Sequence, residues 1–296
     1  MTWPAASAAG LGGLPHDELW ANRANAARIS NWALGGRDNY EADRAVGTQL
    51  RAAAPWFEAS VKITRAYSHL TVRALAKRQI RHFLNLGCGL PLLNRTDPDI
   101  HTVASESIPH ATILHVDHDP MVGGHARMCM AGPPGNHPYL HADLRQITGI
   151  LQQPDVQSLK AGGEPVGVLL HDVLPYLTDT AEVDHILGTL RDWLPLGSAI
   201  SLTHATADLR PEQATAAARI IEQAGIPYRP RTHGQIRDLL SPWQLLSPGL
   251  VPTGRCHPAH KHTLLPKHHS GAYAAIAIHP VNRYPEQVSS SPKDTP

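Results

Sequence analysis

From Arg81 onward, the chain alternates short apolar runs with stretches of helical pattern. The runs of strand length cover residues 82–86, 111–117, 137–141, 166–171 and 199–203. The helical candidates cover residues 99–107, 120–130, 144–152, 181–193 and 211–224. Because strands that alternate with helices are joined by right-handed crossovers, this order predicts a mainly parallel sheet buried on both faces.

The end of the chain breaks this alternation. Two further strand candidates, near Trp243–Leu246 and Tyr273–Ile278, have no long helix between them. We therefore expect an antiparallel hairpin at one edge of the sheet. With it, the sequence predicts a doubly wound α/β fold with a seven-stranded, Rossmann-like sheet.

The first 80 residues have a different pattern. Ile63, Tyr67, Leu70 and Ala74 recur at 4-3-4 spacing and predict one apolar stripe on a helix over residues 57–80. Residues 16–54 are expected to be largely helical, with a break at Gly35-Gly36. We expect a helical cap over 16–80, an α/β domain over 81–280, and disordered ends at 1–15 and 281–296.

Charge and cysteine content argue against several classes of function. Lys and Arg total 26 and Asp and Glu total 25, which gives no support for a nucleic-acid-binding surface. Cys88, Cys129 and Cys256 show no CxxC spacing, so a disulfide framework or a cysteine zinc site is not indicated. The chain has no apolar run of membrane-span length and no signal-peptide pattern at its start. We expect a cytoplasmic protein with no membrane partner.

A glycine turn, Asn85-Leu86-Gly87-Cys88-Gly89-Leu90-Pro91, directly follows the first strand. In a doubly wound sheet this turn lies beside the ligand crevice, and its glycines let a ligand approach the backbone. The next two strands end in Asp117, which can accept both hydroxyls of a ribose, and in Asp143, which suits an adenine amine. Because position 92 is Leu, the third glycine of a dinucleotide site is missing, and a nucleoside without a pyrophosphate is favoured. Each acid could equally be a helix N-cap.

With these residues in place, the chain resembles class I S-adenosylmethionine-dependent methyltransferases. More closely, it is similar to an actinobacterial methyltransferase family long catalogued as a domain of unknown function. The segment Arg28–Val46, with its Leu34-Gly35-Gly36-Arg37-Asp38-Asn39-Tyr40 core, resembles that family's LGGKDNY signature. Further similarities cover Phe83–Pro91, His115–Pro120, Ala142–Arg145, Leu196–His204, Gly249–Pro258 and Ser270–Ala275.

The resemblance implies S-adenosylmethionine as cofactor, S-adenosylhomocysteine as product, and methyl transfer to a small-molecule acceptor in secondary metabolism. A homodimer is left open. The residues that it implies for cofactor binding are Arg37, Asn39, Tyr40, Asn85, Gly87, Cys88, Gly89, Leu90, Pro91, Asp117, His118, Asp119, Asp143, Leu144 and His171.

Three positions depart from the family pattern. Asn85 stands where the family carries an acid, so the charge is lost while an acceptor oxygen remains. Arg255-Cys256-His257-Pro258 replaces a Trp-Arg-Pro motif, and the pair His171-Asp172 follows the fourth strand in place of apolar residues. For an oxygen or nitrogen acceptor, a base must reach the acceptor's proton. His171, Asp172 and His204 are the catalytic candidates, because they lie at strand ends that face the crevice.

Gly35–Tyr40 allows two interpretations. The segment could form a lid that brings donors to the cofactor, which we favour. Alternatively, it is a helix C-cap followed by a restart, with Asp38 as N-cap and Glu41 at the third position. Both can hold together.

No metal site is expected. The histidines of residues 257–269 lie in a Pro-rich loop without a matching cysteine pair. Two other functions stay open. One is an enzyme that uses the bound sulfonium for a cyclisation or rearrangement without methylation. The other is a non-catalytic protein with a degenerate nucleoside pocket. An NAD-dependent oxidoreductase is disfavoured by the missing third glycine.

Overall fold

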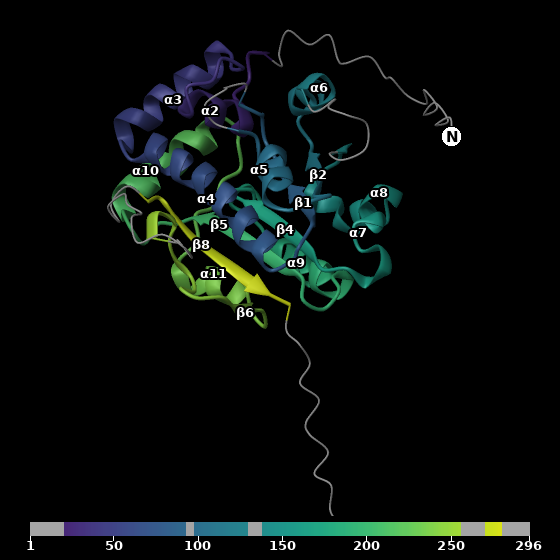
Figure 1. Cartoon of the computed structure of the whole chain (residues 1–296). Helices are drawn as coiled ribbons and strands as arrows, with labels where there is room; N and C mark the ends of the chain where they lie inside the picture. Colours follow the sequence, from purple (N-terminus) through teal and green to yellow (C-terminus); the bar gives the residue numbers. More distant parts are fainter. Residues whose placement is uncertain (1–20, 93–97, 130–137, 256–269, 280–296) are drawn as a thin grey trace, which may run out of the picture.

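One mixed β-sheet runs through the middle of the computed structural model, which describes residues 21–92, 98–129, 138–255 and 270–279 (Figure 1). Its strands are β1 His82–Leu86, β2 Thr112–Asp117, β3 Tyr139–His141, β4 Val166–His171, β5 Ala199–Ala205, β6 Gln244–Leu245, β7 Val251–Pro252 and β8 Ala272–Ile278.

The strand order is β3-β2-β1-β4-β5-β8-β6, and β7 also pairs with β8. The first five strands of this order are parallel, whereas β8 is antiparallel to β5 and to β6. The chain direction across the sheet reverses between β1 and β4. In an open α/β sheet, ligands bind at the carboxyl ends of the strands at such a reversal.

Helices cover both faces of the sheet (Figure 1). The helices are α2 Ala26–Ala33, α3 Glu41–Ala53, α4 Phe57–Lys77, α5 Ile100–Ser107, α6 Pro120–Cys129, α7 Ile147–Leu151, α8 Pro154–Ser158, α9 Thr180–Trp193, α10 Pro211–Gln223 and α11 His233–Leu239. Short 3₁₀ turns add η1 Leu144–Gln146, η2 Ala161–Gly163, η3 Leu174–Tyr176 and η4 Thr253–Arg255. None of the described helices is long and apolar enough to span a membrane.

The side-chain alternation of the strands divides the core in two. Leu84, Leu114 and Val168 pack on the face covered by α7, α9 and α11. Phe83 and Leu169, one residue along, pack on the opposite face against α4 and α5. This period of two decides which polar side chains at the strand ends share a face.

A third, smaller core joins α2 and α3 to α10 through Ile29, Leu50 and Ile221 (Figure 1). A buried ion pair sits beside it: Arg28 Nε lies 2.7 Å from Asp43 Oδ2, and the two side chains are 1% and 0% exposed. The Asp43 carboxylate also accepts hydrogen bonds from the backbone N–H groups of Asn25 and Tyr40. The pair therefore fixes the start of α2 to the start of α3.

The predicted order of strands and helices is confirmed, including the antiparallel pairing of β6 with β8. The described sheet has eight strands where seven were predicted. The short helices α8 and α11 and the two-residue strand β7 were not predicted. The stripe on α4 is partly wrong, because Thr71 and Leu75 are buried where Leu70 and Ala74 are only half-buried. The predictions for residues 1–15, 257–269 and 281–296 lie outside the described residues.

Candidate functional site

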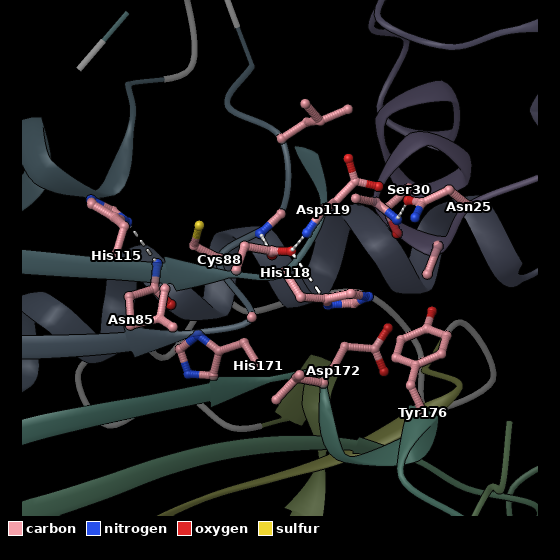
Figure 2. Close-up of a pocket in the computed structure, with 18 of the residues that line it drawn as sticks. Asn25, Ser30, Asn85, Cys88, His115, His118, Asp119, His171, Asp172 and Tyr176 are labelled. Atoms are coloured by element: carbon pink, nitrogen blue, oxygen red, sulfur yellow. Dashed lines mark hydrogen bonds and ion pairs between the residues drawn. The ribbon is translucent and has the colours of Figure 1, made fainter. Parts of the chain in front are cut away.

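A cavity of about 450 Å³ opens at the carboxyl ends of β1, β2 and β4, at the predicted reversal point. Its walls come from the sheet, from α2 and α4, and from the segment 225–227. Figure 2 shows Asn85 and His115 toward one end of the view and Asp172, Tyr176, Ser30 and Asn25 toward the other. Residues of the N-terminal helices and of the sheet therefore line one cavity.

The glycine turn forms the floor of the cavity. Gly87 and Gly89 both have left-handed backbones, with φ of +68° and +64°, which glycine adopts without steric cost. A Cβ at Gly87 would overlap the Val173 side chain, whereas a Cβ at Gly89 would meet no atom within 4 Å. The space above Gly89 is thus open for a ligand, and Cys88, Leu90 and Pro91 line the same cavity.

Asp117 closes the turn from the end of β2. Its Oδ2 accepts a hydrogen bond from Gly89 N at 2.8 Å, and its Oδ1 accepts one from Asp119 N at 3.0 Å. Burial raises the pKa of this carboxyl. His118, beside it, is exposed and lines the cavity, with Nδ1 at 3.8 Å from Asp117 Oδ1.

Two other acids near the cavity also cap helices. Asp119 Oδ1 accepts a hydrogen bond from Met121 N at 2.7 Å, at the start of α6. Asp143 Oδ1 accepts one from Arg145 N at 2.9 Å, at the start of η1. Asp119, Asp143 and Leu144 all line the cavity. The N-cap interpretation therefore holds for Asp143 but not for Asp117, whose oxygens accept from Gly89 N and Asp119 N. Asp143 Oδ2 is paired with the half-exposed Arg145.

Asn85, the departure from the family pattern, has a specific partner. Its Nδ2 lies 3.2 Å from His115 Nδ1. Because the amide nitrogen can only donate, the imidazole accepts at Nδ1 and carries its proton at Nε2. A carboxylate at position 85 would require a proton at Nδ1 instead. Asn85 and His115 both line the cavity.

His171 lies at the end of β4 with both ring nitrogens engaged. Nδ1 is 2.7 Å from Ser68 Oγ, and Nε2 is 2.8 Å from Ser201 Oγ. Burial, with a smaller effect of His69, lowers the pKa of His171 to about 3. A neutral ring held by two hydroxyls is a fixed wall of the cavity and a weak base at neutral pH.

Asp172, the next residue, has the properties of a base. Its φ of +57° puts a non-glycine residue in the left-handed region. The carboxylate has no hydrogen bond or ion pair with any part of the chain that the structure describes, and burial raises its pKa to about 7. Tyr176 lies next to it, and the pKa of Tyr176 is raised by burial and by the Asp172 charge (Figure 2). Backbone strain at a titratable cavity residue is typical of functional sites.

His204, the third catalytic candidate, does not line the cavity. Along β5, Thr203 is paired with His171, so His204 points to the opposite face of the sheet. There it is 0% exposed, with Nδ1 at 2.8 Å from Ala205 O and Nε2 at 3.0 Å from Arg231. We therefore remove His204 from the catalytic candidates.

Arg37, Asn39 and Tyr40 do not line the cavity either. Gly35 N donates to Trp32 O and Gly36 N donates to Asn31 O, which ends α2 in a Schellman motif. The next helix, α3, begins with a capping box, as in our second interpretation. Its N-cap is Tyr40, not Asp38, and its third residue is Asp43, not Glu41. The segment acts on the cavity indirectly, because the cavity residue Asn31 accepts hydrogen bonds from Asp38 N and Asn39 Nδ2.

Several cavity residues were not predicted from the sequence. Asn25 and Ser30 come from α2 and its N-cap, Arg65 and Ser68 come from α4, and Tyr176 comes from η3. On α4 a signal was present, since Thr64, Arg65, Ser68 and His69 form the polar face opposite the apolar stripe. No group of three or more histidine, cysteine or acidic side chains suited to a metal occurs among the described residues.

Comparison with known proteins identifies the family and the fold. The family model described as S-adenosyl methyltransferase matches residues 14–280. The fold is similar to a DUF574 family protein from Streptomyces avermitilis (TM-score 0.81, 27% identity, covering 88% of this chain and 99% of that one). It is also similar to a putative methyltransferase from Thermobifida fusca (TM-score 0.79, 31% identity, covering 88% and 96%). No curated protein sequence matches the chain.

Proposed function

The chain belongs to the S-adenosyl methyltransferase family, and we propose that it methylates a small molecule held between α2 and the turn after β4, with Asp172 as the base. It is thus an S-adenosylmethionine-dependent methyltransferase. The observation that carries the proposed mechanism is Asp172: a cavity carboxyl in a left-handed backbone, free of hydrogen bonds among the described residues, with its pKa near neutrality.

The residues around the glycine turn fit the cofactor. The open space above Gly89 accepts a ligand that touches the backbone. Asp117 offers a buried carboxylate whose oxygens can accept the two ribose hydroxyls, and Asp143 offers an acceptor for the adenine amine. We propose these two roles, with Leu90, Pro91 and Leu144 as apolar walls for the adenosine.

The reaction needs alignment and one proton transfer. When bound, S-adenosylmethionine supplies an electrophilic methyl group on a sulfonium that becomes a neutral thioether. Asp172 takes the proton from the attacking oxygen or nitrogen of the acceptor, so that the new carbon bond leaves a neutral product. A base with a pKa near the working pH is efficient, because about half of it is ionised and the ionised form is still basic enough to take the proton. His171 stays neutral and holds the geometry of the wall beside it.

The acceptor end of the cavity supports a small substrate. Asn25 and Ser30 offer polar contacts, whereas Leu34, Ile226 and Pro227 offer apolar ones. This mixture is typical of pockets for small organic molecules. The family resemblance supports a further proposal, that the reaction belongs to the secondary metabolism of an actinobacterium.

Titration calorimetry with S-adenosylmethionine and S-adenosylhomocysteine tests the cofactor site. We expect both to bind, and no binding at millimolar concentration would refute the function. Methyl-labelled cofactor and fractionated small-molecule extracts then test transfer. The proposal is supported if the wild type transfers the methyl label to a small-molecule product and Asp172→Asn does not. A changed acceptor with the methyl group still on the cofactor would show a non-methylating enzyme instead.

A further inference from the structure

Arg231 is a fully buried cation outside the proposed chemistry. The residue is 1% exposed, and no carboxylate lies within 4.0 Å of its guanidinium among the residues that the structure describes. Removing a charge from water costs several kcal/mol unless hydrogen bonds compensate for it. A buried arginine with no ion pair among the described residues therefore indicates that its hydrogen bonds have a specific structural use.

Those hydrogen bonds go to the turn that follows Asp172. Arg231 Nη1 donates to Leu174 O at 3.2 Å, and Nη2 donates to Leu177 O at 2.9 Å. The two carbonyls bracket the 3₁₀ turn η3, which contains Tyr176. A planar guanidinium fixes two acceptors at a set spacing, which a lysine ammonium cannot do.

His204 completes the anchor on the other side. Its Nε2 accepts from Arg231 Nη1 at 3.0 Å, and burial lowers the pKa of His204 to about 3, which keeps the ring neutral. The Arg231 backbone N donates to Ala205 O, at the end of β5. The guanidinium is thus held by the sheet and can act as a rigid support.

The neighbouring chain strengthens this connection. Arg229 N donates to Pro175 O at 2.7 Å, and Arg229 Nη1 donates to Thr178 O at 2.8 Å. A few residues earlier, Gly225, Ile226 and Pro227 line the cavity itself. The segment 225–231 therefore lines the proposed acceptor end of the cavity and forms hydrogen bonds to the turn that carries Tyr176.

We propose that Arg231 is a positioning residue for methyl transfer: its buried guanidinium fixes the turn Leu174–Tyr176 and so holds Asp172 and Tyr176 in their places at the cavity. This inference rests on the proposed role of Asp172. It also explains why a β5 histidine is buried and neutral on the face away from the cofactor, because His204 serves as the acceptor that orients Arg231.

The first test uses two probes that need no acceptor: S-adenosylhomocysteine, and sinefungin, which carries an amine where the cofactor carries its S-methyl group. At about pH 8, Asp172 should favour the protonated amine roughly tenfold or more over S-adenosylhomocysteine. Asp172→Asn should abolish this preference. Arg231→Met should reduce the preference for sinefungin to the same extent, and Arg231→Lys should keep part of it. The double variant, Arg231→Met with Asp172→Asn, should show no further loss of this preference.

The matched control is Arg219→Met, an exposed arginine on α10, which should keep the wild-type ratio. S-adenosylhomocysteine affinity reports the cofactor site by itself. If that affinity is absent in the wild type, the proposed function fails. If the Asp172 variant loses the preference while folded Arg231 variants keep it, the Arg231 inference alone fails.

Hydrogen–deuterium exchange gives a readout that is independent of Asp172. In Arg231→Lys and Arg231→Met, amides of residues 174–178 should exchange at least about tenfold faster, with β1 and β2 unchanged. Wild-type exchange in this turn would overturn the inference. If Arg231→Met fails to fold, Arg231→Lys alone decides, through both its exchange and its sinefungin preference.

Discussion

At the scale of single residues, Asp172 combines a positive φ with a raised pKa. Asparagine is the matched replacement, because Asn and Asp tolerate the left-handed region better than other side chains. An Asp172→Ala variant would mix loss of the carboxyl with backbone strain. Asp172→Asn removes the charge without adding that strain, so it is the matched variant wherever the carboxyl is tested.

The pH dependence of stability tests the Asp172 pKa. In the unfolded chain the carboxyl ionises near 3.8, whereas in the folded protein it keeps its proton up to about 7. The folded state therefore binds more protons between these values, and the free energy of unfolding falls as pH rises through them. Asp172→Asn should gain stability over the wild type by up to about 4 kcal/mol from pH 4 to pH 8, measured by urea unfolding. A pH-independent difference would contradict the shift.

The two turn glycines form a matched pair. Gly89→Ala should cost about 1–2 kcal/mol of stability from its positive φ, because no protein atom opposes the new methyl group. Its affinity for S-adenosylhomocysteine should fall sharply. Gly87→Ala should be the more destabilising variant, since its methyl group meets Val173. Thermal unfolding and calorimetry check both, and retained affinity in Gly89→Ala would place the ligand elsewhere.

The ribose assignment has its own test. Asp117→Ala should weaken cofactor binding by about 1–3 kcal/mol, because two hydroxyl contacts are lost. The exposed neighbour His118→Ala is the control for a nearby cavity side chain, and a smaller effect is expected. An unchanged dissociation constant in Asp117→Ala would show that the ribose lies elsewhere.

At the scale of elements, the Arg28–Asp43 pair joins α2 to α3. Breaking one partner of a buried ion pair costs about 3–5 kcal/mol, because the other charge stays buried. We expect this loss in Arg28→Met, measured by chemical unfolding. In Arg73→Met the partly exposed pair with Glu106 is lost, and the cost should stay below about 1 kcal/mol. Equal losses of stability in the two variants would show that the Arg28–Asp43 pair does not stabilise the packing of α2 on α3.

Elements were predicted from the sequence where periodicity was long and uniform. The five parallel strands match the structure within two residues at each end. The helix α11 was not found, although Thr232 and Gln235 form a capping box at its start, because its seven residues give too short a pattern. The cap at Tyr40 was misplaced because Asp43, not Glu41, is buried against Arg28. That choice is made by a partner 15 residues away, which local sequence does not encode.

At the scale of the whole molecule, the cavity residues at strand ends were predictable from the sequence, whereas those from the N-terminal helices and the late loops were not. Gly87, Gly89, Asp117 and Asp143 follow strand ends, so the topology alone brings them together. Asn25, Tyr176 and residues 225–227 reach the cavity through packing between distant segments. His204 was assigned to the wrong face because only the register of β5 against β4 decides which residue joins His171.

The three cores predict uneven stability across the molecule. The small core of α2, α3 and α10 should open more readily than the sheet, so its amides should exchange faster. S-adenosylhomocysteine should slow exchange in α2 as well as at residues 87–91, because both line one cavity. Amides of α8 serve as the control. Exchange-coupled mass spectrometry checks this, and an unaffected α2 would show that the cap does not respond to the cofactor site.

The division of the cavity walls has a consequence for changing what the enzyme accepts. One wall of the cavity is formed at the ends of the strands by the glycine turn, Asp117 and Asp143. The opposite wall is formed by residues 25–34 and 225–227. Chimeras that exchange only those two segments with relatives should inherit a donor's acceptor range and keep the recipient's cofactor affinity. Under the proposed function, acceptor range can therefore change through the residues of these two segments that line the cavity, while the turn and the acids at the strand ends stay the same.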